Sequence, residues 1–296
     1  MLLVGTALAQ EDGVAPPIVG GERAASYDEV VLLVACDEGG QCAACSGSVI
    51  ADGWVLTAAH CVAPQAGFTP SHVYVYAGDE YNDIDASWEA AAWYPHPDYD
   101  GSDYDFDVAM VAVDDDLAEL PRMPIDGVDL ADDDLGADVR LVGWGLTSDE
   151  DDGADLARRS ADVPLEGYTV DFVYTLDLNG QNACHGDSGG PVLRIDGDGY
   201  AQMAVMDFLY GGNGAYCEAN GLGSARLTAY LDFIGEYAAY TTVGGTPTGG
   251  GEAFAGADDG SGLTGGCATG GGSPGWWWVG LVLCSGRRVV QGTAAT

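Results

Sequence analysis

The chain has 296 residues and carries 47 Asp and Glu against nine Arg and no Lys, a formal net charge of −38 at pH 7. Such a charge repels a phosphate backbone, so the composition excludes a nucleic-acid-binding protein. With 47% hydrophobic and 9% aromatic residues, the chain can still bury a substantial core and is not a disordered polyelectrolyte. We therefore expect one sizeable domain with short extensions.

Residues 1–9 are predicted to be a secretory signal peptide. They are apolar and end in Ala7-Leu8-Ala9, the small-x-small pattern that signal peptidase cleaves. The segment is short and lacks a basic start, which suggests that the true start lies upstream of Met1. The alternative is an apolar N-terminus that stays attached.

The region from Ile18 to Tyr240 is divided by Gly, Pro and Asp into short apolar runs rich in β-branched and aromatic residues. These runs cover residues 30–34, 46–50, 54–57, 73–76, 108–113, 139–143, 191–195 and 201–208. Only residues 227–237 repeat apolar side chains at helical spacing. Many strands followed by one helix predict an all-β, antiparallel fold, a barrel or a sandwich.

Eight cysteines in an exported chain indicate disulfides. Six of them lie in the strand-rich region: Cys36, Cys42, Cys45, Cys61, Cys184 and Cys217. Cys42 and Cys45 form a C-x-x-C pair with no second pair at zinc-site spacing, so we predict no metal site built from cysteines.

Three motifs supply the groups that nucleophilic catalysis by a serine needs: a hydroxyl, an imidazole, a carboxylate and backbone amides for the developing oxyanion. His60 lies in T-A-A-H-C, Asp107 opens D-V-A-M, and Ser188 lies in G-D-S-G-G-P. The glycines of the last motif permit unusual backbone angles, so the amides of Gly186 and Ser188 could converge on one point.

In this order, and preceded by I-V-G-G at Ile18, the motifs resemble the chymotrypsin-trypsin family over nearly all of residues 18–240. The resemblance implies two six-stranded antiparallel β-barrels, with a C-terminal helix and the site between the barrels. It also implies that His60 is the general base and then the acid, Asp107 orients it, Ser188 is the nucleophile, and the amides of Gly186 and Ser188 form the oxyanion hole. The alternative is a core histidine and a turn serine without chemistry.

The same resemblance implies a precursor. In the family, cleavage before I-V-G-G frees an ammonium that inserts beside the acid preceding the nucleophile, here Ile18 and Asp187. Residues 10–17 are then a propeptide. They end in Pro16-Pro17 and not in a basic residue, so trypsin-like self-activation is not expected and the activating protease is unknown. The alternative is that the segment stays attached and the enzyme is dormant.

Matching to the family pairs four cysteines: Cys45 with Cys61 beneath the histidine, and Cys184 with Cys217 beside the nucleophile loop. Cys36 and Cys42 have no counterpart in the family, and they could close a small loop together.

The resemblance also assigns three residues to the substrate pocket. Asn182, six residues before Ser188, would lie at its base and cannot supply the charge that selects Arg or Lys. Asp207 stands where a small hydroxyl usually meets the catalytic acid, and Leu209 where a glycine usually leaves the pocket open. We therefore expect a narrowed pocket and a preference for small or medium uncharged P1 side chains.

Asp207 argues against this function. A second carboxylate against Asp107 would crowd like charges, so one of the two would hold a proton or swing away, and His60 could be misoriented. The alternative is that the alignment is off by one or two residues. Asp207, Leu209 and the nonbasic activation site motivate a rival hypothesis, a catalytically weak or inactive homologue that acts as a surface binding module.

Two acidic clusters carry further expectations. The first surrounds Asp107 and should raise the pKa of His60 in a way that salt weakens: Asp98, Asp100, Asp103 and Asp105. The second, Asp79, Glu80, Asp83 and Asp85, corresponds to a loop that binds calcium in some family members. That segment is shorter than the metal-binding version, and a solvated acidic loop is the alternative. No other cofactor is expected.

The C-terminal part differs in composition. Of residues 241–275, 14 of 35 are Gly, which predicts a flexible linker. Residues 276–296 contain an apolar run from Trp276 to Cys284 and then Arg287-Arg288, about half the length of a spanning helix. With Cys267 they resemble C-terminal sorting signals of some Gram-negative bacteria, including the myxobacterial type; a disordered tail or a shifted reading frame after Cys284 is the alternative.

Together these features predict a bacterial serine endopeptidase that is secreted or held at the cell surface. Its partners would be protein or peptide substrates and an activating protease. The tail could make a transient contact with a membrane or with sorting machinery.

Overall fold

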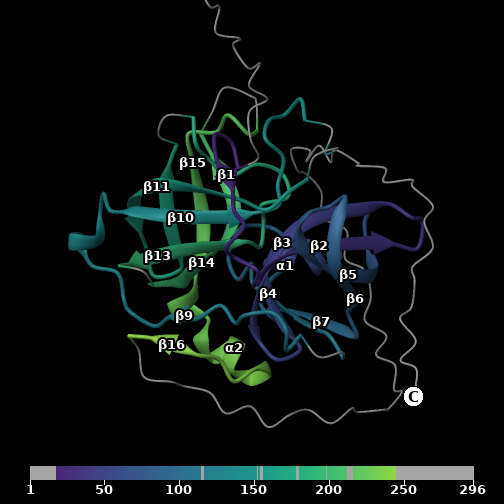
Figure 1. Ribbon diagram of the computed structural model, residues 1–296. Coiled ribbons are helices and arrows are strands. Elements are labelled where there is room, and N and C mark those ends of the chain that lie inside the picture. Colours follow the sequence, from purple (N-terminus) through teal and green to yellow (C-terminus); the bar gives the residue numbers. More distant parts are fainter. Residues whose placement is uncertain are drawn as a thin grey trace, which may run out of the picture.

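The computed structural model describes residues 18–114, 117–151, 153, 156–177, 180–197, 199–211 and 216–244. Two mostly antiparallel sheets lie side by side, one on the left and one on the right of Figure 1. The predictions for residues 1–17, for the linker from 245 onward and for the tail fall outside the described residues.

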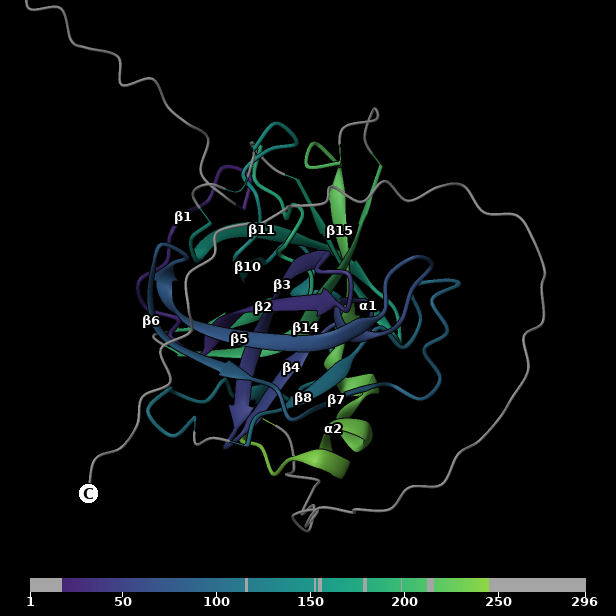
Figure 2. The same cartoon turned by 90° about the vertical axis from the view of Figure 1, so that its right-hand side faces the viewer.

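The first sheet is curled and has seven strands in the order β6-β5-β2-β3-β4-β8-β7. Its strands are β2 (Val30–Asp37), β3 (Cys42–Ala51), β4 (Trp54–Thr57), β5 (Pro70–Glu80), β6 (Asp83–Glu89), β7 (Ala92–Pro95) and β8 (Ala109–Ala112). Figure 2 shows β5 wrapping across this sheet. Among the described strands, the end strands β6 and β7 do not pair with each other, so this half curls without closing.

The second sheet closes on itself. Its six barrel strands are β10 (Asp138–Gly143), β11 (Arg159–Tyr168), β12 (Phe172–Leu176), β15 (Gly221–Arg226), β14 (Gly199–Tyr210) and β13 (Pro191–Asp196). Pairing of β13 with both β10 and β14 closes the ring. Short strands extend it: β1 (Glu22–Arg23) on β11, and β9 (Ile125–Asp126) with β16 (Thr242–Val243) beside β14.

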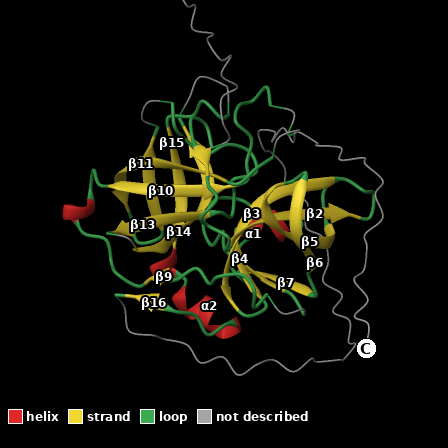
Figure 3. Cartoon of the chain, viewed as in Figure 1, coloured by secondary structure: helices red, strands yellow, loops and turns green. Residues whose placement is uncertain are grey.

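The helices are short, as the colouring of Figure 3 makes clear. They are α1 (Ala59–Val62), α2 (Leu231–Tyr237) and the 3-10 turns Asp132–Asp134 and Leu227–Ala229. The predicted helix at 227–237 is therefore confirmed, with a 3-10 first turn. None of the helices in the described part of the chain is both long and apolar enough to cross a bilayer.

Apolar side chains fill the space inside each sheet and the seam between them. The closed barrel contains a cluster that includes Leu141, Val163 and Val192. The larger cluster of the curled sheet also takes in Trp144 and Val205 from the second half. Burial of apolar area at this seam holds the two halves together, and the loops that meet there are fixed by it.

The predicted fold class is confirmed: the protein is mostly β, with a chymotrypsin-like arrangement and a short C-terminal helix. One detail differs, because the first half is a curled seven-stranded sheet and not a closed six-stranded barrel. The boundary of the linker also shifts. Thr242 and Val243 pair with Ile125 and Asp126, so the folded part extends a few residues beyond Tyr240.

Candidate active site

His60 and Asp107 meet at the seam between the two halves. His60 lies on α1, which begins two residues after β4 ends, and Asp107 lies two residues before β8. The Oδ2 atom of Asp107 is 2.5 Å from Nδ1 of His60, and its Oδ1 atom accepts the backbone N–H of His60 at 2.7 Å. Asp107 is only 2% exposed, so one buried carboxylate fixes both the ring and the backbone of the histidine.

Ser188 and His60 are anchored to adjacent residues of β3. Cys61 is joined by a disulfide to Cys45, and the backbone N–H of Ser46 donates to the carbonyl of Ser188 at 2.8 Å. The sequence motifs are 128 positions apart at His60 and Ser188. Strand β3 brings them to the same place.

Ser46 was not identified from the sequence, yet it connects four segments. Its Oγ donates to the carbonyl of Gly186 at 2.9 Å and accepts the backbone N–H of Trp144 at 2.9 Å. Its carbonyl accepts a hydrogen bond from Thr57 at 2.8 Å. A serine following a cysteine in a strand carries no signal for this role, because its partners are distant in sequence.

The nucleophile loop leaves two backbone donors available. Gly189 donates its N–H to Met206 and Gly190 to Asp187, whereas the N–H groups of Gly186 and Ser188 have no backbone acceptor among the described residues. Gly186 has φ +94°, a conformation that favours glycine. The loop can therefore offer two amides to a negatively charged oxygen.

Asp187 is completely buried beside this loop. Its carboxylate accepts the backbone N–H of Gly145 at 2.8 Å and that of Cys184 at 2.9 Å. A Cβ at Gly145 would lie 2.5 Å from the Asp187 carboxyl carbon, so only glycine permits this approach. Burial raises the pKa of Asp187 to about 7, against an ordinary 3.8.

The predicted partner of Asp187 also lies in this region. The side chain of Ile18 is fully buried in the cluster of the closed barrel. The next residue, Val19, accepts the backbone N–H of Asn182 at 3.2 Å. The start of the domain is thus docked against the segment that leads to Ser188, and an ion pair between Ile18 and Asp187 stays a prediction.

A narrow pocket of about 10 Å³ opens beside Ser188, room for about one water molecule. Its walls are formed by Ala183, Cys184, Ser188, Met206, Asp207, Leu209, Tyr216 and Leu222. Asp207 and Leu209 both lie in its walls, and their role in binding substrate stays a prediction. Met206, Tyr216 and Leu222 were missed, since the sequence motifs do not mark these wall positions.

The assignment of Asn182 to the base of the substrate pocket stays a prediction. Asn182 is 1% exposed and is not among the lining residues. Its Nδ2 donates to the carbonyl of Ala219 at 3.0 Å, and its Oδ1 accepts the N–H of Ala183 at 2.9 Å. The amide is used by the backbone around it, because a buried amide must satisfy both its donor and its acceptor.

Asp207 lies against the His60–Asp107 pair, so the alignment that placed it there is confirmed. It is 6% exposed, and its Oδ1 is 4.0 Å from Nδ1 of His60. Burial, and next the charge of Asp107, raise the pKa of Asp207 well above its ordinary range. The pKa of Asp107 is lowered, because its contacts with His60 outweigh burial.

The pKa of His60 is raised, as predicted, but for a different reason. Burial opposes the charged ring, and the charge and hydrogen bond of Asp107 outweigh that effect. We expected the exposed loop acids around Asp107 to be the cause, whereas the group that raises the pKa of His60 is Asp107 itself. A raised pKa means that the ring keeps its proton to higher pH.

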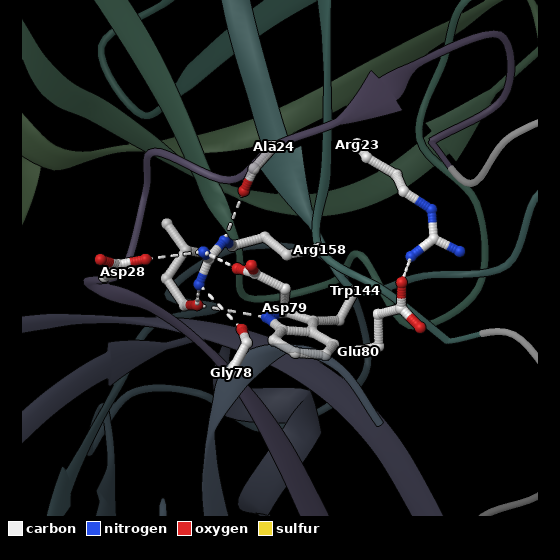
Figure 4. Close-up of polar contacts among 9 residues, drawn as sticks. Arg23, Ala24, Asp28, Gly78, Asp79, Glu80, Trp144 and Arg158 are labelled. Atoms are coloured by element: carbon white, nitrogen blue, oxygen red, sulfur yellow. Dashed lines mark hydrogen bonds and ion pairs between the residues drawn. The ribbon is translucent and has the colours of Figure 1, made fainter. Parts of the chain in front are cut away.

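The acidic hairpin between β5 and β6 does not fit a calcium ion. Asp79 accepts from Arg158 at 2.6 Å, and Glu80 is paired with Arg23. Figure 4 shows both contacts. No three potential ligands of this hairpin lie within 4.8 Å of one another in the described part of the chain. Guanidinium groups take up the charge that a cation would have neutralised.

Arg158 is itself buried at the seam and was not singled out from the sequence. It is 1% exposed and donates to the carbonyls of Ala24 at 2.8 Å and Gly78 at 3.0 Å. The carbonyl of Val30 is shared: Nη1 of Arg158 approaches it at 3.5 Å, and the indole of Trp144 donates to it at 3.2 Å. The chain has nine arginines and no lysine. This scarcity of basic side chains was a signal that an arginine has a structural role.

The three disulfides of the strand-rich region are present as expected. They join Cys45 to Cys61, Cys184 to Cys217, and Cys36 to Cys42. The first lies beside His60, and the second forms part of the pocket wall. The third closes the turn between β2 and β3.

The fold and the site together define the class of serine proteases with a chymotrypsin-like fold: a His–Asp pair and a G-D-S-G-G-P loop at the seam between a curled sheet and a closed barrel. Comparison with known proteins agrees with this class. The trypsin family model matches residues 18–234, and the chain therefore belongs to the trypsin family, whose members are serine endopeptidases.

The chain is similar to several proteins from arthropods. It is 30% identical over 202 residues to brachyurin of Leptuca pugilator, a match covering 64% of this chain and 85% of brachyurin. It is 28% identical over 171 residues to trypsin Blo t 3 of Blomia tropicalis, covering 50% of this chain and 62% of that protein. It is 25% identical over 209 residues to a chymotrypsin of Phaedon cochleariae, covering 64% and 70% of the two chains.

Proposed function

We propose that the protein hydrolyses peptide bonds by a Ser188–His60–Asp107 triad through an acyl-enzyme. Ser188 Oγ attacks the carbonyl carbon of the substrate while His60 Nε2 takes its proton, and the N–H groups of Gly186 and Ser188 receive the oxyanion. His60 then gives the proton to the leaving amine. Water, activated by the same ring, hydrolyses the ester and regenerates the hydroxyl.

One observation carries this proposal: the buried Asp107 carboxylate lies 2.5 Å from Nδ1 of the His60 ring and accepts the backbone N–H of His60 at 2.7 Å. The Nδ1–H tautomer that this contact stabilises leaves Nε2 free as the base. The link from Ser46 to Ser188 supports the same roles, because it anchors the nucleophile to the strand that anchors His60.

The narrow pocket supports a preference for small or medium uncharged P1 side chains. Its volume of about 10 Å³ leaves little room for an aromatic or a long basic side chain. A library of peptides cleaved mainly after Arg or Lys would contradict this preference.

We also propose that the chain is made as an exported precursor. Cleavage before Ile18 would free an ammonium to pair with Asp187, which is fully buried and has a raised pKa without such a partner. Residues 1–9 as a signal peptide, 10–17 as a propeptide and 276–296 as a sorting signal complete the proposal. The bacterial origin rests on residues 267–288 alone, and the relatives compared above are from arthropods. N-terminal sequencing and intact-mass analysis of the secreted form test these assignments.

Labelling with a fluorophosphonate tests the catalytic function directly. After release of Ile18, the probe should add to one serine, and Ser188→Ala should abolish the label while the fold is retained. A folded, correctly cleaved chain that takes no label would instead support the rival hypothesis of a non-catalytic binding module.

A further inference from the structure

Asp107 and Asp207 form a buried pair of carboxyl groups beneath the His60 ring. They are 2% and 6% exposed, and one oxygen of each lies within 4.8 Å of one oxygen of the other and of a ring nitrogen of His60. Two ionised carboxylates this close together and shielded from water repel strongly. One proton shared between the two groups removes that repulsion, and the protonated carboxyl can then donate to the other carboxylate.

The hydrogen-bond donors around the pair decide which carboxyl group carries that proton. Both oxygens of Asp107 are close to donors of His60, at 2.5 and 2.7 Å. The Oδ1 of Asp207 is 4.0 Å from the same ring nitrogen, too long for a hydrogen bond. Its Oδ2 is buried, and no donor among the described residues reaches it. Charge is therefore stabilised on Asp107 and not on Asp207.

We propose that Asp207 is a positioning residue that keeps a proton at neutral pH and donates it in a hydrogen bond to Asp107. The O–H of Asp207 then holds the Asp107 carboxylate in the orientation that grips His60. The acid that argued against catalysis thus becomes part of the support of the triad. Its catalytic consequence rests on the proposed function, whereas the location of the proton does not.

The other groups facing Asp207 are consistent with a neutral carboxyl. Those whose charge or ionisation interacts with it are Asp105, Asp107, Tyr99, Tyr104, Tyr216 and Tyr230, and His60 lies above it. Burial raises the pKa of each of the four tyrosines, so all four are uncharged at pH 7. Asp105 adds negative charge, which further favours a proton on Asp207.

The pKa of His60 tests where the proton lies. A carboxylate at 4.0 Å in a partly buried site would raise that pKa by about 2 to 3 units, whereas a neutral carboxyl would hardly affect it. We expect D207N to change the pKa of His60, measured by NMR on histidine-labelled full chain, by less than about 0.5 unit. D105N, which removes an exposed acid two residues before Asp107, is the matched control. A fall of 2 units or more in D207N would overturn the proposal.

The donor role is tested by restoring it. In the form that begins at Ile18, D207A removes the donor and should lower kcat/KM by about 10- to 100-fold, since a hydrogen bond to a charged group is lost. D207N and D207S supply an N–H or O–H and should return kcat/KM to within about threefold of the parent. Equal activity of D207A and the parent would refute the role of Asp207 in positioning Asp107.

One measurement needs no variant, in case substitutions at this buried site impair folding. In the form that begins at Ile18, where the freed ammonium is expected to keep Asp187 ionised, the infrared spectrum with isotopically labelled Asp should contain a protonated-carboxyl band at pH 7 that disappears on alkaline titration. Its absence would overturn the proposal. NMR and infrared measurements need no turnover, so a chain without proteolytic activity would count against the proposed function and leave the site of the proton to be decided separately.

Discussion

The guanidinium of Arg158 lies 2.6 Å from the carboxylate of Asp79, at the point where β5 of the curled sheet approaches the chain entering β11 of the closed barrel. The arginine is buried, whereas the carboxylate is 63% exposed. Arg158 therefore stabilises the protein less through the ion pair than through its hydrogen bonds to buried backbone carbonyls on both sides of the seam.

Removing this guanidinium should destabilise the protein strongly. Arg158→Met would leave the carbonyls of Ala24 and Gly78 without a donor, at about 1 to 3 kcal/mol each, so we expect a loss of about 3 kcal/mol in urea denaturation. The matched control is Arg140→Met, which breaks a bidentate but exposed pair with Asp162 worth at most about 1 kcal/mol. Equal losses of unfolding free energy in the two variants would contradict the stabilising role of the buried Arg158 guanidinium.

The same arrangement predicts that calcium has no effect on stability. Asp79 and Glu80 already hold arginines, and a cation would have to displace them. The melting temperature should therefore be the same, within about 1 °C, in EDTA and in millimolar calcium at constant ionic strength. A calcium-specific rise of several degrees would show that the hairpin does bind the ion.

Ser46 should matter for catalysis more than for stability. Ser46→Ala removes the hydroxyl that bonds to Gly186 and Trp144, so the oxyanion loop loses a support and kcat should fall about tenfold, the equivalent of one hydrogen bond. Ser48→Ala is the matched control: it is buried in the same strand and bonds to Gln202 at 2.6 Å. If the two variants have the same kcat on a small-P1 peptide, Ser46 has no special role.

Leu209 should limit the size of the P1 side chain. Leu209→Gly enlarges the pocket beside Ser188 and should raise kcat/KM for a Phe-P1 peptide by tenfold or more, while an Ala-P1 peptide gains nothing. The gain reflects the burial of an aromatic side chain that the parent pocket excludes. The ratio of kcat/KM for the two peptides, measured in one enzyme preparation, needs no separate control. An unchanged ratio would mean that another residue limits the size of the P1 side chain.

Asp187 should make the uncut precursor less stable as the pH rises. Its pKa of about 7 exceeds the ordinary 3.8, so between these values the folded chain binds more protons than the unfolded chain. This contribution to stability is full below pH 4 and is lost progressively up to about pH 7, by about 1.4 kcal/mol per pH unit. The difference in unfolding free energy between D187N and the parent should grow across this window in favour of D187N.

Cleavage before Ile18 should reverse the difference in unfolding free energy between D187N and the parent. The freed ammonium would stabilise the ionised carboxylate, so D187N should then be less stable than the parent at pH 7 and should lack activity. If the unfolding free energies of uncut D187N and the uncut parent changed in parallel with pH, burial would not destabilise the ionised form of Asp187. An active, cleaved D187N would refute the predicted ion pair with Ile18.

Much of the site was readable from the sequence, because the residues that carry chemistry lie in short motifs. The histidine motif and the G-D-S-G-G-P loop each occupy a few consecutive positions, and local glycine chemistry at Gly186 fixes the loop there. Short apolar runs likewise predicted strands, and apolar residues at helical spacing predicted the helix near the end of the domain. These properties depend on neighbours in the chain.

Contacts between distant segments were decided only by the tertiary structure. Ser46 and Arg158 act through partners that lie 11 to 140 positions away, and no pattern in one segment specifies a hydrogen bond to another. The side chain of Asn182 bonds to the backbone of Ala183 and Ala219, because a buried amide needs partners for its donor and its acceptor. The proximity of Asp207 to Asp107 followed from alignment, but which of the two keeps the proton depends on where the donors of His60 lie, and only packing at the seam determines that.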